Sequence, residues 1–151
     1  MQAAARKLRA VKSAKTSSAI DGLLKNIVKG KELLKLQNGA KLFSQGDEGN
    51  AIYFIQTGKV QLNVVSAQGR EAVLAMLGPR DFFGEECLVG NSRRTSTATS
   101  LKPSTVFRIG KRAMLQALHL DSKFSEEFMT SLLARSLNLE EDLCDQLFNH
   151  S

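Results

Sequence analysis

The spacing of apolar residues changes twice along the chain and divides it into three parts. Apolar residues recur at helical spacing from Ser18, a plausible helix cap, to about Val28, and Gly30 follows, which predicts a short helix. Beyond Lys31, short β-prone runs alternate with turn signals such as Asn38-Gly39 and Gly78-Pro79. These runs predict strands over 32–36, 41–43, 51–56, 59–65, 71–77, 93–101 and 105–109.

The pattern becomes helical again after Gly110. We expect a short helix over Lys111–His119 and a long one from Ser122 to about Asn149, which contains neither Gly nor Pro. At 1.5 Å per residue, the long helix would reach about 40 Å, which is longer than a small β unit needs for cover.

Apolar residues of the long helix form two stripes. One is close to a heptad seam and consists of Met129, Leu132, Ser136, Leu139, Leu143 and Gln146; the other consists of Leu133, Leu137, Cys144 and Phe148. Two apolar faces need two surfaces to cover them, so we expect the helix to pack on its own domain and on a second copy of the chain. A single broad face on one core is the alternative.

These elements predict a mainly β protein with flanking helices. The strand spacing favours a double-stranded β-helix, that is, a β-roll of jelly-roll type, followed by a long C-terminal dimerisation helix. We expect a flexible basic arm over 1–18, the β-roll with its short flanking helices over 19–121, and the dimerisation helix over 122–151.

Charge, cysteines and hydropathy restrict the function further. The first 31 residues hold eight basic residues and one acidic residue, so the net charge of +6 belongs to this N-terminal stretch and not to a basic nucleic-acid-binding surface on the roll. Cys87 and Cys144, like His119 and His150, lie far apart, which predicts no metal site and a cytoplasmic chain with reduced thiols. Without a long apolar run or a secretory leader, we expect no membrane association.

The predicted strand over 93–101 differs from its neighbours. From Arg94 to Ser100 only Ala98 is apolar, and an anionic ligand would explain the polar side chains because Arg94 offers a fork of donors and Thr95 a hydroxyl. Gly84 would let the backbone approach a ligand, and a single helical turn over 86–89 would present free N–H groups. Glu85 is suited to accept hydrogen bonds from sugar hydroxyls. An exposed Thr-rich edge strand with solvated arginines explains the same pattern equally well.

A resemblance favours the ligand site. Phe83-Gly84-Glu85, followed after a gap by Arg94-Thr95, resembles the phosphate-binding cassette of cyclic-nucleotide-binding domains, and Phe43–Asp47 ahead of Ile52–Ile55 is similar to the same family. The resemblance covers roughly residues 20–149. It implies that Arg94 binds the cyclic phosphate of cAMP or cGMP, that Glu85 binds the ribose 2′-hydroxyl, and that Thr95 adds a phosphate or purine contact. Backbone amides of Gly84, Glu85, Glu86 and Cys87 would complete the cradle, with Leu62, Val64 and Leu74 as apolar lining.

Within this superfamily, the long helix resembles that of bacterial catabolite-activator (Crp/Fnr) regulators. The resemblance implies a homodimer through this helix and DNA contact only through a C-terminal helix-turn-helix domain absent from this chain. Those regulators hold adenine with a Thr-Ser pair midway along the helix. At the comparable depth this chain has Asn138-Leu139-Glu140, and its Thr130-Ser131 pair lies about two turns earlier.

Three other functions remain to be weighed. An iron–sulfur sensor of the same fold needs about four thiolates, and the sequence has two dispersed cysteines. A haem sensor needs an axial ligand with a partner group, and no such partner is evident in the sequence. A cupin-like enzyme needs a His-rich metal set, so we expect no catalytic and no metal-binding residues and no cofactor. A degenerate domain that serves only as a dimer platform, responding to another small molecule or to none, stays open.

Overall fold

The computed structural model describes residues 22, 24, 25, 27, 29–90 and 92–148, with side chains as far as residue 137. The described residues fall into two compact units, one within residues 27–116 and one that holds the described residues before 27 and after 116. Of the predicted N-terminal helix, residues 22, 24 and 25 are helical, and the arm over 1–18 lies outside the described residues.

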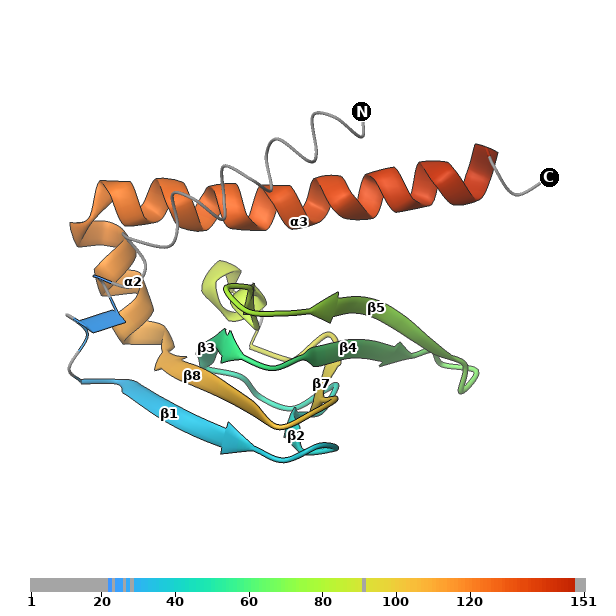
Figure 1. Cartoon of the computed structure of the whole chain (residues 1–151), viewed down its shortest axis with the longest axis horizontal. Coiled ribbons are helices and arrows are strands. Elements are labelled where there is room, and N and C mark those ends of the chain that lie inside the picture. The colour runs from blue at the N-terminus through green and yellow to red at the C-terminus, as the bar shows by residue number, and fades with distance from the viewer. Residues whose placement is uncertain (1–21, 23, 26, 28, 91, 149–151) are drawn as a thin grey trace. The chain divides into compact units, whose positions relative to one another are not determined.

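The first unit holds eight strands in two antiparallel four-stranded sheets (Figure 1). One sheet has the order β1-β8-β3-β6 and the other the order β2-β7-β4-β5. The strands are β1 (Lys31–Leu36), β2 (Lys41–Phe43), β3 (Ala51–Thr57), β4 (Val60–Val65), β5 (Glu71–Leu77), β6 (Phe82–Phe83), β7 (Thr97–Ser100) and β8 (Ser104–Gly110). The predicted mainly β architecture is confirmed.

Strand β3 lies between β8 and β6, and its first five residues are buried, so side chains on both of its faces are covered. Tyr53 and Ile55 contribute to the core cluster, whereas the alternating Ile52 and Phe54 are buried on the opposite face. The core cluster consists of Phe43, Ala51, Tyr53, Ile55, Val60, Leu77, Phe83, Ala98 and Val106. Both sheets therefore contribute side chains to one core, and the ring of Phe83 stacks on that of Tyr53 with centroids 5.1 Å apart.

The predicted strand over 93–101 is wrong at its N-terminal end, since regular pairing is confined to β7. Arg93 forms an isolated bridge with Glu48 instead. The backbone of Arg94 is bonded to a turn rather than to a strand, with its N–H donating to the carbonyl of Asp47 and its own carbonyl accepting from Gly46. Strand β6 was not predicted because two residues are too short a run to carry a pattern.

Most of the polar side chains of β7 are satisfied within the protein. The hydroxyl of Ser100 donates to the carbonyl of Gln37, and that of Thr97 accepts from the N–H of Gln45 at 2.9 Å. Ser96 and Ser100 are buried, while Thr97 and Thr99 are half-buried on the alternate side. The hydroxyls of this strand therefore give little evidence for a ligand. The evidence that remains is the burial of the charged Arg94.

Helix α2 (Lys111–Leu120) and helix α3 (Ser122–Phe148) follow the strands, close to their predicted ranges. Asp121 lies between them, and its carboxylate accepts from the N–H of Phe124 at 3.0 Å as a helix cap does. Within the part of the chain that the structure describes, neither of these helices combines the length and apolar character that crossing a bilayer requires.

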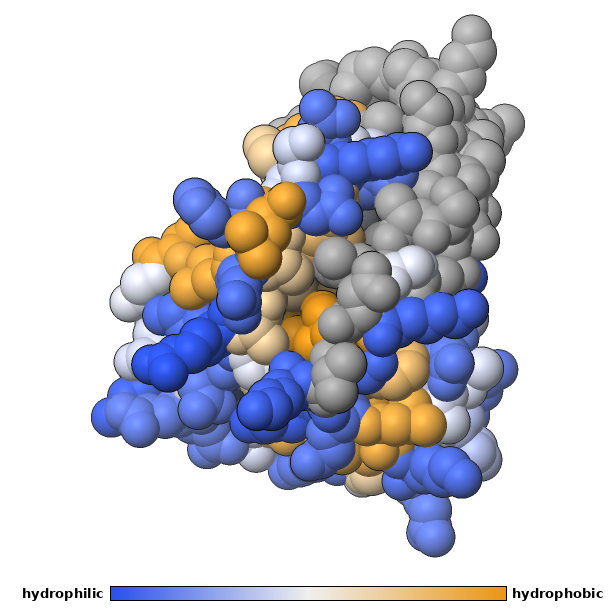
Figure 2. Space-filling view, turned by 90° about the vertical axis from the view of Figure 1, so that its left-hand side faces the viewer, coloured by the Kyte–Doolittle hydropathy of each residue, from blue (hydrophilic) through white to orange (hydrophobic). Residues whose placement is uncertain are grey.

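Several apolar side chains of α3 are exposed. Met129 is 59% exposed, Leu133 57% and Leu137 43%, while Leu132 is half-buried and Ser136 exposed. The other predicted dimer residues, Leu139, Leu143 and Gln146, lie beyond the described side chains. On the face drawn in Figure 2, apolar surface of the described residues lies in separate groups among hydrophilic side chains.

Candidate functional site

Arg94 is the most unusual side chain of the β unit, because a permanently charged group is only 4% exposed. Its guanidinium carbon lies 4.3 Å from the centroid of the Phe43 ring and 5.7 Å from that of Tyr53. Both distances allow a cation–π interaction, which partly replaces the hydration that the guanidinium has lost. The cation is thus built into the aromatic part of the core.

Two backbone carbonyls hold the guanidinium. Nη1 donates to the carbonyl of Gly84 at 2.9 Å, and Nη2 donates to the carbonyl of Ala51 at 2.7 Å. Nη1 also lies 3.6 Å from a carboxylate oxygen of Glu86, while the buried Nε has no hydrogen-bond partner. Because an arginine carries five N–H donors, this arrangement leaves donor capacity unused at a buried position.

Backbone hydrogen bonds fix the position of residue 94 and so the point from which its side chain extends. Besides the two bonds of Arg94 to the turn, the N–H of Gly49 donates to the carbonyl of Ser92 at 2.6 Å. The turn itself is closed by the carboxylate of Asp47, which accepts from the N–H of Ser44. The segment over 92–94 is therefore paired with the loop that joins β2 to β3.

Two glycines make room for the guanidinium. A Cβ at Gly49 would lie 2.1 Å from Nε and 2.3 Å from Cζ of Arg94, and a Cβ at Gly84 would lie 2.8 Å from Nη1. Gly84 also has a φ of +81°, a conformation that favours glycine, whereas the backbone of Gly49 is not in that region. The sequence pattern singles out Gly84 but not Gly49, since nothing in the sequence reveals the contact of Gly49 with Arg94.

The short helix η1 (Glu85–Val89) follows Gly84, one residue longer than the predicted turn over 86–89. Glu85 and Glu86 occupy its first turn, and Cys87 is buried. The thiol of Cys87 donates to the carbonyl of Ala51 over 3.7 Å, so this carbonyl accepts from both Cys87 and Arg94. Burial raises the pKa of the Cys87 thiol; the positive charge of Arg94 acts in the opposite direction and the charge of Glu86 in the same direction as burial.

The structure brings together some of the predicted site residues and separates others. Gly84, Glu86, Cys87 and Arg94 are linked by the contacts above, and Glu85 lies beside them in η1. Thr95 is exposed, whereas the adjacent Arg94 is buried. Arg93 is also exposed and donates to the carbonyl of Gly46 at 3.2 Å.

The predicted apolar lining lies on β4 and β5. Leu62 packs against the core cluster and Val64 is half-buried on the same side of β4. Leu74 is 46% exposed and falls at an irregularity of the β4–β5 pairing, where Leu62 faces Ala75 and Asn63 faces Val73. Leu77 and Ala75 of β5 face the core, so alternation along the strand places Leu74 on the opposite, exposed side.

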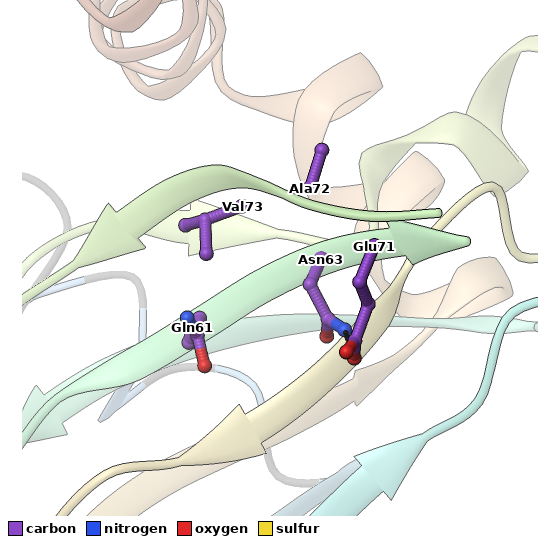
Figure 3. A pocket seen from close by; sticks show the side chains of 5 residues that line it. All are labelled: Gln61, Asn63, Glu71, Ala72 and Val73. Carbon is purple, nitrogen blue, oxygen red and sulfur yellow. Dashed lines mark hydrogen bonds between the residues drawn. The ribbon is translucent and has the colours of Figure 1, made fainter. Parts of the chain in front are cut away.

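An open pocket of about 230 Å³ lies on the same two strands (Figure 3). It is lined by Gln61, Asn63, Glu71, Ala72 and Val73, and the amide of Asn63 donates to the carboxylate of Glu71 at 2.8 Å. None of the predicted ligand-binding residues lines it. Among the described residues, no group of three or more His, Cys, Asp or Glu side chains is placed to hold a metal ion.

Comparison with known proteins identifies one domain family. The family model of the "Cyclic nucleotide-binding domain" matches residues 33–121. A "CRP-like cAMP-activated global transcriptional regulator" of Mycobacterium tuberculosis is 28% identical over 131 residues, which are 87% of this chain and 57% of the relative. The "Cyclic AMP receptor protein" of Thermus thermophilus is 35% identical over 111 residues, 70% of this chain and 50% of that protein. The chain spans about half the length of the curated relatives it matches.

Solved structures give the same picture of the fold. The catabolite activator protein of Thermus thermophilus superimposes with a TM-score of 0.70 at 25% identity, covering 87% of this chain and 62% of its own. The predicted β-roll is confirmed by this similarity. The similar proteins are ligand-binding domains and transcriptional regulators, not enzymes.

Replacing Gly49 tests the packing of Arg94. Gly49→Ala places a methyl group 2.1 Å from Nε, so either Arg94 or the loop must move, and we expect a loss of about 1–3 kcal/mol in the free energy of unfolding. Gly78→Ala is the matched control, because no atom lies within 4 Å of its Cβ position and its backbone conformation is ordinary. Urea denaturation measures both.

The Arg94→Ala background identifies the cause of that loss. If the clash with Arg94 is responsible, Gly49→Ala costs much less when Arg94 has already been truncated. An equal cost in both backgrounds would show that Gly49 matters for another reason.

The raised pKa of Cys87 predicts a pH dependence of stability. Above the ordinary pKa of a thiol, about 8.5, the unfolded chain ionises at Cys87 while the folded chain keeps the proton. The contribution of this group is therefore complete below that pH and is lost as the pH rises toward the folded-state pKa. We expect the unfolding free energy of the wild type to fall more steeply than that of Cys87→Ala between about pH 8.5 and 10. Parallel slopes would contradict this assignment.

Proposed function

Because this chain belongs to the cyclic nucleotide-binding domain family, we propose that it binds cAMP or cGMP and senses this ligand for a transcriptional regulator. One observation carries the proposal: the guanidinium of Arg94 is buried beside Gly84 and the first turn of η1, with an unpaired Nε. A buried cation with unused donors is the chemistry that recognises a phosphate oxygen.

In this proposal Arg94 binds the cyclic phosphate, and Glu85 accepts a hydrogen bond from the ribose 2′-hydroxyl. Backbone N–H groups from Gly84 to Cys87 surround the phosphate, while Leu62, Val64 and Leu74 line the ribose and base. Thr95 is exposed in the structure described, so its contact requires the segment after Arg94 to turn when the ligand enters.

The hydrogen bonds of Arg94 indicate how binding would be transmitted. A phosphate oxygen that takes the N–H of Nη1 now bonded to the carbonyl of Gly84 would release that carbonyl. Gly84 lies directly before η1 and has the conformational freedom of glycine, so a change there alters the position of η1. Ligand binding would thereby replace the hydrogen bond between Arg94 and Gly84 by one between Arg94 and the phosphate.

We also propose that α3 forms a parallel homodimer, in the cytoplasm, as the sensory part of a regulator. Exposed apolar side chains on α3, including Met129 and Leu133, support an interface on this helix. The names of the relatives from Mycobacterium tuberculosis and Thermus thermophilus describe cAMP activation and cAMP reception in those proteins. We assign no DNA contact to the described residues.

A dimer platform without a natural cyclic-nucleotide ligand is the second candidate. It is favoured by the two carbonyls that already hold Arg94, because a guanidinium with these partners can serve packing alone. The two candidates differ in whether cyclic nucleotides bind at all, which the next experiment measures.

Calorimetric titration with cAMP and cGMP tests the role of Arg94. Arg94→Ala removes a charge-assisted contact from a buried position, and we expect a loss of at least about thirtyfold in affinity. Arg94→Lys should also bind much more weakly, because one ammonium group does not reproduce the planar fork.

Arg93 provides the matched control, since it is adjacent, equally charged and exposed. Arg93→Ala and Arg93→Lys should bind nearly as the wild type does. Equal losses at both positions would show that net charge alone attracts the ligand, and a wild type that binds neither nucleotide at millimolar concentration would favour the platform.

Sedimentation velocity tests the dimer. Leu139→Lys combined with Leu143→Lys introduces charges into the predicted seam, and we expect a folded monomer where the wild type is a dimer. Leu120→Lys, at a position that is 74% exposed before α3 begins, is the control and should remain dimeric. A monomeric wild type at high concentration would contradict the dimer.

A further inference from the structure

The carboxylate of Glu86 forms an ion pair with the guanidinium of Arg94, the cation of the candidate site. One of its oxygens lies 3.6 Å from Nη1 of Arg94, the same nitrogen that donates to Gly84. The side chain of Arg94 is 2% exposed and that of Glu86 is 21% exposed. Glu86 is therefore the partner nearer to solvent, and its negative charge stands beside a donor nitrogen of the cation that an entering anion would bind.

The distance between Glu86 and Arg94 is longer than that of a tight salt bridge. At 3.6 Å, the two atoms are within Coulombic reach but beyond the usual length of a charge-assisted hydrogen bond, which is about 2.7–2.9 Å. The carbonyls of Gly84 and Ala51 already direct the guanidinium at 2.9 and 2.7 Å. Glu86 is thus not required to orient Arg94, and its main effect on the site is its charge.

The charges of Arg94 and Glu86 also act on Cys87, which follows Glu86 in η1. Arg94 lowers and Glu86 raises the pKa of the Cys87 thiol, so one group in this turn experiences both of them. The potential that a phosphate would meet here is consequently the sum of a cation and a nearby anion, and not that of an isolated arginine.

We infer that Glu86 competes with the phosphate of a ligand for Arg94 and thereby sets the affinity of the site for monoanionic cyclic phosphates. Without a ligand, the pair is neutral. A bound cyclic phosphate adds a second negative charge beside the carboxylate of Glu86, and the repulsion between them weakens binding. This inference rests on the proposed function and goes beyond the backbone role that the resemblance implies for Glu86.

Neutral substitutions of Glu86 test the inference on the full chain. Glu86→Gln keeps the shape of the side chain and removes its charge, so we expect cAMP and cGMP to bind about five- to tenfold more tightly at low ionic strength. Glu86→Ala should shift the affinity in the same direction. Raising the salt concentration should reduce the difference from the wild type, because the repulsion is then screened. Calorimetric titration gives the affinity, and thermal unfolding confirms that each variant is folded.

Glu32→Gln is the control for net charge, since Glu32 is exposed on β1 and the change is identical. Tighter binding by both Glu86 variants with an unchanged Glu32→Gln supports the inference. Equal tightening by Glu32→Gln, or unchanged or weaker binding by Glu86→Gln, overturns it while the proposed function stands. If neither the wild type nor any variant binds, the proposed function fails and the inference fails with it.

Discussion

The hydrogen-bonded fork of Arg94 is the interaction on which the arrangement of this site depends. Its two terminal nitrogens join the carbonyl at the start of β3 to the carbonyl before η1, and its central carbon lies 4.3 Å from the centroid of the Phe43 ring. The loop before β3 and the segment before β7 are paired through the backbone of the same residue. Segments far apart in the sequence thus converge on one side chain.

A ligand that binds such a cation does not meet an empty site. If a phosphate takes the N–H of Nη1 that the carbonyl of Gly84 now accepts, the affinity reflects an exchange and not the full strength of a new hydrogen bond. The exchange also links binding to the conformation of Gly84. In the proposed site, a weakened affinity and a coupled structural change would be two results of the same exchange.

The sequence predicted the local elements well and the contacts across the fold less well. Strand β5 was predicted with its exact limits because turn signals border it on both sides, and Arg94 was singled out because it is polar within a β segment. The end of the strand over 93–101 was wrong because the partner of Arg94 is a loop fixed by the tertiary structure. The role of Gly49 depends on a contact across 45 residues, which no local pattern encodes.

The position of Tyr53 gives the site a spectroscopic property. The chain contains a single tyrosine and no tryptophan, and the ring of Tyr53 lies 5.7 Å from the guanidinium of Arg94 and stacks on Phe83. The tyrosine emission of the whole protein therefore originates beside the cation of the candidate site. A displacement of Arg94 changes the field at this chromophore, so the unlabelled protein carries its own optical reporter.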